Sequence, residues 1–275
     1  MMSDLFEKFP FYLETGRIVR DYDVRRLKKF ETPGIADRRA VLLARRTKRR
    51  SAGTVTPRFA ACAKGSRCNS GACPRCMRLF RRWFGHAAMS LIGGEAVTFV
   101  TVVGDAFGYE AGSLHRFDPV AAMTWLRRLL SKAGLGTLTV VGGLDISFNV
   151  DGEKRWPDHW RPHFALLVLG SNPERVKAAL EPFIKASESV PRPVQAKNVT
   201  DPLAVITYLV KAAYFRRSSY RAENGRYNTR RLPLKAAQEH ELTLFLDQYQ
   251  PEARLFLQNT RIEKAGLVRM SAIRR

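Results

Sequence analysis

The middle of the chain alternates between short apolar runs, typical of strands, and apolar faces with helical spacing. Residues 95–103 form a β-branched and aromatic run that ends at Gly104, which predicts a strand. Asp118 is a suitable N-cap for the next segment, whose apolar residues recur every three or four positions up to Gly134. The pattern therefore predicts a strand followed by a capped helix.

A pair of strands is predicted next. Residues 137–141 and 144–150 are separated by two glycines, and the second run alternates apolar and polar side chains, with Asp145 among the polar ones. After a loop, residues 163–169 are apolar enough for a central strand. Three neighbouring strands are therefore expected in this part of the chain.

The remaining pattern predicts mainly helices. In order, it indicates a helix over 172–187, a strand over 193–199, a helix from Asp201-Pro202 that carries 208–214, and a helix over 235–257 with a break at Pro251. This order of elements predicts an α+β fold, with an antiparallel sheet and helices packed mainly on one face.

The charge of the chain indicates the kind of partner that it binds. The 275 residues include 47 Lys+Arg against 25 Asp+Glu, a formal net charge of +22. The basic residues concentrate in two segments, 17–50 and 211–231. Because neutralising phosphates releases counterions, such a chain is expected to bind a polyanion, above all nucleic acid. The alternatives are a solvated helix face, a surface kept for solubility, or attraction to anionic lipid.

No part of the sequence suggests insertion into a membrane. No apolar run approaches the roughly 18–20 residues needed to cross a bilayer, and the first ten residues lack a secretory apolar stretch. We therefore expect a soluble, cytoplasmic protein without a membrane partner.

All four cysteines fall within fifteen residues, at Cys62, Cys68, Cys73 and Cys76. A Cys-Pro-Arg-Cys turn supplies two thiolates, and the loop before it can bring the other two to one tetrahedral ion. The alternatives are two disulfides, which a reducing compartment disfavours, or four unrelated thiols. The spacing predicts a structural zinc site. The adjacent Arg78, Arg81 and Arg82 could extend a nucleic-acid surface.

Three short segments contain side chains that could together form one catalytic site. They are the polar face of the strand with Asp145, the run 160–168 with His163, and the helix with Tyr208 and Lys211. In this order, preceded by the cysteine cluster, they resemble the motifs of rolling-circle replication initiators and related single-strand transposases, the HUH endonuclease superfamily. The resemblance covers about residues 60–217.

This resemblance implies a specific reaction. Tyr208 would attack a phosphodiester of single-stranded origin DNA and become covalently joined to it, while Lys211 would favour the phenolate and hold the phosphate. A His-x-His pair and an acid would hold a catalytic Mg²⁺ or Mn²⁺ that polarises the phosphate. DNA, as a single strand or a hairpin, would be the partner, together with host replication proteins.

One position departs from the family pattern. The second histidine of the chelating pair is replaced by Ala165, which cannot bind a metal ion. Three explanations are open: His159 joins His163 and Asp145 at the ion, the ion is held weakly with additional waters, or nicking activity is lost and DNA binding kept. The alternative function is therefore a non-catalytic, zinc-stabilised DNA-binding protein, such as a repressor or a replication accessory.

Each candidate residue also has an ordinary structural interpretation. His163 could be a hydrogen-bonded core histidine, Asp145 a turn cap, and Tyr208 a half-buried helix residue. Tyr214 is a rival nucleophile, but on a helix it would point about 120° away from Tyr208. In the basic segment after the helix, aromatic and basic residues alternate as in single-strand binders, at Arg216, Arg217, Tyr220, Arg221 and Tyr227.

The sequence thus suggests four parts. They are a basic N-terminal segment (1–55), a small zinc-binding module built on the four cysteines (56–90), an HUH-like nuclease and DNA-binding domain (91–232), and a helical basic C-terminal tail (233–275). A third function class, a basic RNA-associated protein, would also account for the charge and the cysteines.

Overall fold

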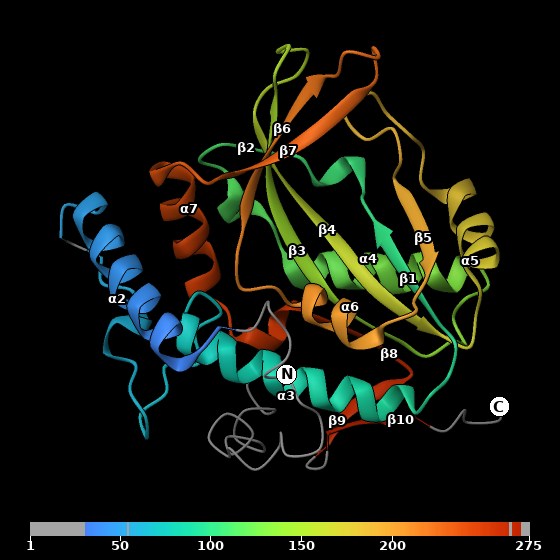
Figure 1. The fold of residues 1–275 in the computed structure, drawn as a ribbon, viewed down its shortest axis with the longest axis horizontal. Helices are drawn as coiled ribbons and strands as arrows, with labels where there is room; N and C mark the ends of the chain where they lie inside the picture. The colour runs from blue at the N-terminus through green and yellow to red at the C-terminus, as the bar shows by residue number, and fades with distance from the viewer. Residues whose placement is uncertain (1–30, 54, 264–265, 271–275) are drawn as a thin grey trace.

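The computed structural model describes residues 31–53, 55–263 and 266–270, and its centre is a curved mixed sheet (Figure 1). The strand order is β5-β1-β4-β3-β6-β7, with β2 pairing β4 and β8 pairing β3. Every pairing is antiparallel except that of β3 with β6. The strands are β1 (Val97–Val102), β2 (Tyr109–Glu110), β3 (Val140–Asp151), β4 (His159–Leu169), β5 (Val194–Asn198), β6 (Phe215–Arg221), β7 (Tyr227–Pro233) and β8 (Leu255–Gln258). A separate pair is formed by β9 (Thr260–Glu263) and β10 (Gly266–Arg269).

Six α-helices in the described part of the chain accompany this sheet, which confirms the predicted α+β class. They are α2 (Pro33–Arg50), α3 (Pro74–Ile92), α4 (Pro119–Lys132), α5 (Pro173–Leu180), α6 (Pro202–Leu209) and α7 (Ala236–Asp247). The predicted starts of α4, α5 and α6 are confirmed: Asp118, Asn172 and Asp201 each accept a hydrogen bond from a backbone N–H of the first turn, and proline follows each of them.

Two apolar clusters lie on the two faces of the sheet. One contains buried residues of α4, α5 and α7 against side chains such as Trp160 and Phe164. The other contains buried residues of α3 and α6 against Val141, Ala165 and Leu167. Because successive strand residues point to opposite faces, the even positions of β4 face the first cluster and the odd positions, including His163, face α6.

The predicted break at Gly142 and Gly143 is wrong, because both glycines lie inside the continuous strand β3. A Cβ atom on Gly143 would overlap the carbonyl oxygen of Leu209, and one on Gly142 would overlap the carbonyl oxygen of Ala165. These glycines therefore permit close approach of backbones rather than a turn. As a result, the end of α6 lies directly on β3.

Three predicted helices are longer than the observed ones. The helix α5 ends at Leu180 and is followed by a short 3-10 turn, Glu181–Phe183. The helix α6 ends at Leu209, so Lys211 and Tyr214 lie beyond it. The helix α7 ends at Asp247, and after a 3-10 turn at Pro251–Arg254 the chain forms β8, because Leu255–Gln258 pairs with the glycine-containing half of β3.

The hairpin that follows α6 was not predicted from the sequence. Strands β6 and β7 pair over seven residues each and are joined by a turn at 222–226. This hairpin projects from the end of the sheet, close to the turn between β3 and β4 (Figure 1). The basic segment predicted from charge is thus a two-stranded ribbon.

Candidate functional site

The four cysteine sulfurs lie together at the N-terminus of α3. All four Sγ atoms are within 4.8 Å of one another, and those of Cys62 and Cys68 lie 3.6 Å and 3.7 Å from that of Cys76. A disulfide would need about 2.05 Å, whereas ligands at about 2.3 Å on a tetrahedral zinc ion are about 3.8 Å apart. The cluster therefore could hold a metal ion such as zinc.

The four cysteines are close together and mostly buried, an environment in which a bound cation would stabilise their thiolate forms. Cys62, Cys73 and Cys76 are buried and Cys68 is half-buried. The neighbouring Cys62 sulfur, together with burial, raises the pKa of Cys73 and that of Cys76, because several adjacent thiolates repel one another. A bound divalent cation would remove this repulsion, and its thiolate ligands would then be deprotonated.

The second candidate site joins two strands and the segment after α6. Asp145 on β3 lies directly opposite His163 on β4, and the His163 Nε2 atom is 3.1 Å from the Asp145 Oδ2 atom. The Nζ atom of Lys211 makes an ion pair with the same carboxylate oxygen. The predicted residues His163 and Lys211 therefore both contact Asp145.

This ion pair lies inside the protein. Asp145 is fully buried, and the side chains of His163 and Lys211 are only 4% and 15% exposed. Burial acts to raise the pKa of Asp145, but the charges of Lys211 and His163 outweigh it and hold that pKa well below its usual range. Asp145 is therefore a carboxylate that fixes the position of the Lys211 ammonium group.

Tyr208 belongs to the same group through Lys211. The Lys211 Nζ atom lies 5.1 Å from the centroid of the Tyr208 ring, a cation–π distance. The Tyr208 ring also makes a T-shaped contact with Phe99 at a centroid distance of 6.0 Å, and Tyr208 is half-buried. The sequence predicted a helix that carries both residues, whereas α6 ends at Leu209, so Lys211 contacts Tyr208 from the segment after the helix.

The rival residue Tyr214 is in a different environment. Its hydroxyl group is buried, and no described residue hydrogen-bonds to it. Burial raises the pKa of Tyr214 to about 12, although Arg254 and two other arginines act in the opposite direction. Its phenol is therefore harder to ionise than an exposed one, which disfavours it as a nucleophile.

Ala165, which occupies the position of the second histidine in the family pattern, is inaccessible to solvent. Ala165 is fully buried in the cluster that contains Ile206, Leu209 and Val210. The possible metal ligands here are therefore the Asp145 carboxylate and the His163 imidazole. The Lys211 ammonium group already contacts the Asp145 carboxylate oxygen that would face an ion. These residues, as arranged, do not fit the divalent ion that the family pattern implies, because two donors replace three and Lys211 would repel it.

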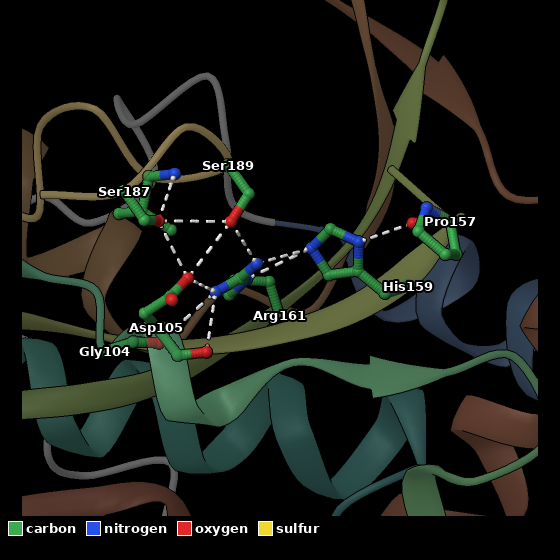
Figure 2. Close-up of polar contacts among 8 residues, drawn as sticks. Gly104, Asp105, Pro157, His159, Arg161, Ser187 and Ser189 are labelled. Carbon is green, nitrogen blue, oxygen red and sulfur yellow. Dashed lines mark hydrogen bonds and ion pairs between the residues drawn. The ribbon is translucent and has the colours of Figure 1, made fainter. Parts of the chain in front are cut away.

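His159 lies on the same face of β4 but in a separate network, shown in Figure 2. Its Nε2 atom is 2.8 Å from the Arg161 Nη2 atom, and its Nδ1 atom is 2.9 Å from the Pro157 carbonyl oxygen. At about 3.3 Å per residue, His159 is roughly 13 Å from His163 along the strand. The structure therefore does not bring His159 to Asp145.

The same network fixes a loop over this part of the sheet. The Arg161 guanidinium group donates to Asp105 and to Ser189 Oγ, at 3.2 Å and 3.1 Å. Ser187 and Ser189 both donate to the Asp105 carboxylate and, with Arg161, hold the pKa of Asp105 below its usual range (Figure 2). The guanidinium group of Arg161 is therefore occupied by contacts within the protein.

The predicted nucleic-acid contacts fall into two groups. Arg216, Arg217, Tyr220 and Arg221 lie on the ribbon formed by β6 and β7. By contrast, Arg78 donates to the Glu31 carbonyl oxygen and Arg81 is buried, donating to the Thr207 carbonyl oxygen at 3.0 Å. Arg82, on the same helix, is half-buried.

Sequence reasoning missed the arginines that hold the Lys211 segment. Arg81, Arg254 and Arg39 donate to the carbonyl oxygens of Thr207, Lys211 and Ala212, respectively, at 3.0–3.2 Å. They come from α3, from the 3-10 turn before β8, and from α2. No sequence signal identifies them, because nothing in their local pattern distinguishes them from the other arginines of a basic chain.

Compared with protein-family models, curated proteins and solved structures, the chain matches none of them. Within the described residues, no helix has both the length and the apolar composition that a bilayer span requires. The interpretation of the site therefore depends on its own geometry.

Proposed function

We propose that this protein binds DNA and cleaves a single strand through Tyr208, in the manner of rolling-circle replication initiators. One observation carries the proposal: the Lys211 ammonium group contacts both the Asp145 carboxylate and the Tyr208 ring. Tyr208, Lys211, Asp145 and His163 come from three separate segments, and their convergence supports a shared role in chemistry rather than three unrelated ones.

In the proposed reaction, the Tyr208 phenol oxygen bonds to the phosphorus of a DNA phosphodiester. The bond from phosphorus to the 3′ oxygen breaks and its electron pair goes to that oxygen. The phenol loses its proton to solvent, and the 3′ oxygen takes a proton from solvent to form a 3′-hydroxyl. The protein is left joined to the 5′ phosphate. Lys211, held by Asp145, supplies positive charge beside the phenolate and the phosphate.

The role of Asp145 and His163 in this proposal is to position Lys211. Both are almost fully buried, whereas Tyr208 is half-buried and Lys211 is partly exposed. A phosphate could thus approach the tyrosine and the lysine without displacing the buried pair. No step of this reaction requires an ion at Asp145.

A pool of random single-stranded DNA tests the proposal, because the target sequence is unknown. Wild-type protein is expected to form an adduct that survives denaturation and carries DNA through a phosphotyrosine. Tyr208→Phe should abolish the adduct, and the matched variant Tyr214→Phe should retain it. The reactions are run with EDTA and with Mg²⁺ or Mn²⁺, and an adduct on Tyr214 alone would overturn the assignment.

The second candidate function is a non-catalytic DNA-binding protein, a repressor or replication accessory. The complete burial of Ala165 and of Asp145 favours it. It predicts DNA binding that is sensitive to salt, no adduct with any of these ions, and unchanged affinity in Tyr208→Phe. The adduct experiment therefore separates the two functions.

For the cysteine cluster we propose a structural zinc ion rather than a catalytic one. Four thiolates would fill a tetrahedral coordination sphere and leave no position for a substrate. The cluster begins α3, and Arg81 of that helix donates to the Thr207 carbonyl oxygen, next to Tyr208. The ion would thus stabilise the helix that supports the candidate nucleophile.

A further inference from the structure

The ribbon formed by β6 and β7 is strongly charged; its strand β7 is exposed, whereas β6 is mostly half-buried and exposes only Tyr220 and Arg221. Six arginines lie on it or in its turn, against one acid, Glu223. None of the six forms an ion pair with another described residue, and every residue of β7 except Leu232 is exposed. The arginines are Arg216, Arg217, Arg221, Arg226, Arg230 and Arg231.

The register places like charges side by side on the ribbon. Arg217 on β6 lies directly opposite Arg231 on β7, and Arg230 is opposite Ser218 on the other face. Like charges in directly opposite positions destabilise a sheet. A polyanion bound to the ribbon would turn this repulsion into attraction, since each phosphate would face an uncompensated arginine.

The end of the ribbon is held firmly against the turn between β3 and β4. The Tyr227 hydroxyl donates to Glu153 Oε2 at 2.8 Å, and Ser219 Oγ donates to Asp151 Oδ1 at 2.6 Å. The Arg155 guanidinium carbon lies 3.9 Å from the Tyr227 ring centroid and 4.2 Å from that of Trp156. The ribbon is therefore ordered before any partner binds.

These contacts also limit what the ribbon can recognise. Arg155 lies over the Tyr227 ring, although Tyr227 remains 48% exposed, and Tyr220, 38% exposed, lies on the opposite face of the ribbon, because Tyr227 pairs with Arg221. Single-strand binders use several stacking rings along a groove. The ribbon offers arginines instead of such a platform.

The ribbon is continuous with the candidate site. Arg217 pairs with Asn149 of β3, and Asn149 lies on the same face of that strand as Asp145. The separation of four residues corresponds to about 13 Å. A nucleic acid held by the ribbon would therefore continue toward Tyr208 and Lys211.

We propose that the β6–β7 ribbon inserts into the major groove of duplex DNA. That groove, about 12 Å wide, admits a two-stranded ribbon, and arginine is the residue that most often reads guanine there. The major groove of an RNA duplex is too deep and narrow for such an element. This inference goes beyond the proposed function, because duplex binding does not depend on strand cleavage.

Binding measurements on the full-length protein test the inference. The Arg217→Gln/Arg231→Gln double variant is compared with wild type on a 20-base-pair DNA duplex, a single strand of equal length, and an RNA duplex of equal length. Each lost phosphate contact lowers the slope of log affinity against log salt by about 0.9. On the DNA duplex, the double variant should therefore show a slope smaller by about 2 and an affinity lower by about tenfold or more than wild type.

Two further variants control for charge and folding. Arg128→Gln/Lys132→Gln removes the same charge from exposed positions of α4 and should leave the slope unchanged. Arg217→Lys/Arg231→Lys keeps the charge and should restore most of the salt slope, while the loss of the bidentate guanidinium contacts keeps the affinity below that of wild type. Thermal melting of each variant reports whether the fold is retained.

Three results would overturn the inference. They are an equal loss in the α4 control, a loss confined to single-stranded DNA, and tighter binding of the ribbon to the RNA duplex. The same duplex measurement on Tyr208→Phe, together with the adduct experiment, separates the two proposals. Duplex binding that depends on the ribbon, without any adduct, would contradict the proposed cleavage and leave this inference standing.

Discussion

Arg254 holds the main chain of Lys211 in place. Both of its Nη atoms donate to the Lys211 carbonyl oxygen at 3.2 Å, while its Nε atom donates to the carbonyl oxygen of Leu144, next to Asp145. Arg254 is 3% exposed and lies over the Tyr214 ring. One buried side chain therefore connects the backbones on both sides of the Asp145–Lys211 ion pair.

Replacing Arg254 should therefore disturb the ion pair without removing it. Arg254→Gln leaves buried carbonyl oxygens unpaired, and we expect the free energy of unfolding to fall by about 2–4 kcal/mol. Well below its melting temperature, the variant should form the Tyr208 adduct more slowly while its affinity for DNA changes little. Urea unfolding and single-turnover adduct kinetics measure these effects.

The matched control is Arg261→Gln, which removes an exposed arginine paired with Glu263. It should leave both the stability and the adduct rate nearly unchanged, because exposed ion pairs contribute little. If Arg254→Gln reduced stability but left the adduct rate at the wild-type value, a positioning role for Arg254 would be excluded.

The Asp145–Lys211 pair gives a prediction that depends on pH. Asp145→Asn leaves a buried ammonium group uncompensated, and we expect a loss of about 3–5 kcal/mol in stability at pH 7. The folded pKa of Asp145 lies below the unfolded value of about 3.9, so its contribution is present above that pH and is lost as the pH falls below it. The difference between variant and wild type should therefore shrink at low pH.

A double-mutant cycle checks this interpretation. Removing both charges, in Asp145→Asn/Lys211→Met, should restore part of the stability that either single variant loses. The exposed Asp158→Asn serves as the control and should have little effect at any pH. Additive losses in the cycle would show that the two side chains do not interact.

The residues of the candidate site could be selected from the sequence, but their geometry could not. Asp145, His163, Tyr208 and Lys211 were identified by motif order, and the structure brings them together. The prediction that one helix carries both Tyr208 and Lys211 was wrong, because helix periodicity alone cannot locate the end of α6 at Leu209. That end is set by close packing on Gly143, a tertiary contact.

The same limit explains the missed strands. The β6–β7 ribbon is rich in arginine and has no apolar alternation, so its sequence gives no periodic signal for a strand. Likewise, Leu255–Gln258 continues the apolar pattern of α7 but pairs with β3. By contrast, the capped starts of α4, α5 and α6 were predictable, because a cap acts within four residues.

The cysteine cluster predicts one bound metal ion per chain. Elemental analysis of purified protein should find about one zinc, and Cys76→Ser should lose it together with several kcal/mol of stability, because folding of such modules is coupled to metal binding. Chelation should have the same effect on wild type. Ser66→Ala, an exposed change in the same loop, is the control and should retain the ion. Full retention of both metal and stability in Cys76→Ser would exclude a four-thiolate site.

Glu252 gives an opposite dependence on pH. It lies in the 3-10 turn before β8, is 6% exposed, and no described residue hydrogen-bonds to its carboxylate oxygens. Burial raises the pKa of Glu252 to about 8. Because the pKa of Glu252 is raised in the folded protein, folding favours the protonated carboxyl group. The stability that this group contributes is fully present below the unfolded pKa of about 4.3 and is lost as the pH rises through the folded pKa of about 8.

Glu252→Gln should therefore be increasingly more stable than wild type as the pH rises. At pH 5 the two proteins should differ little, whereas at pH 8.5 the variant should be more stable by a few kcal/mol, at about 1.4 kcal/mol per pKa unit. Urea unfolding at both values measures the difference, with the exposed Glu223→Gln as control. A constant difference between wild type and Glu252→Gln across this range would mean that Glu252 ionises at its ordinary pH in the folded protein.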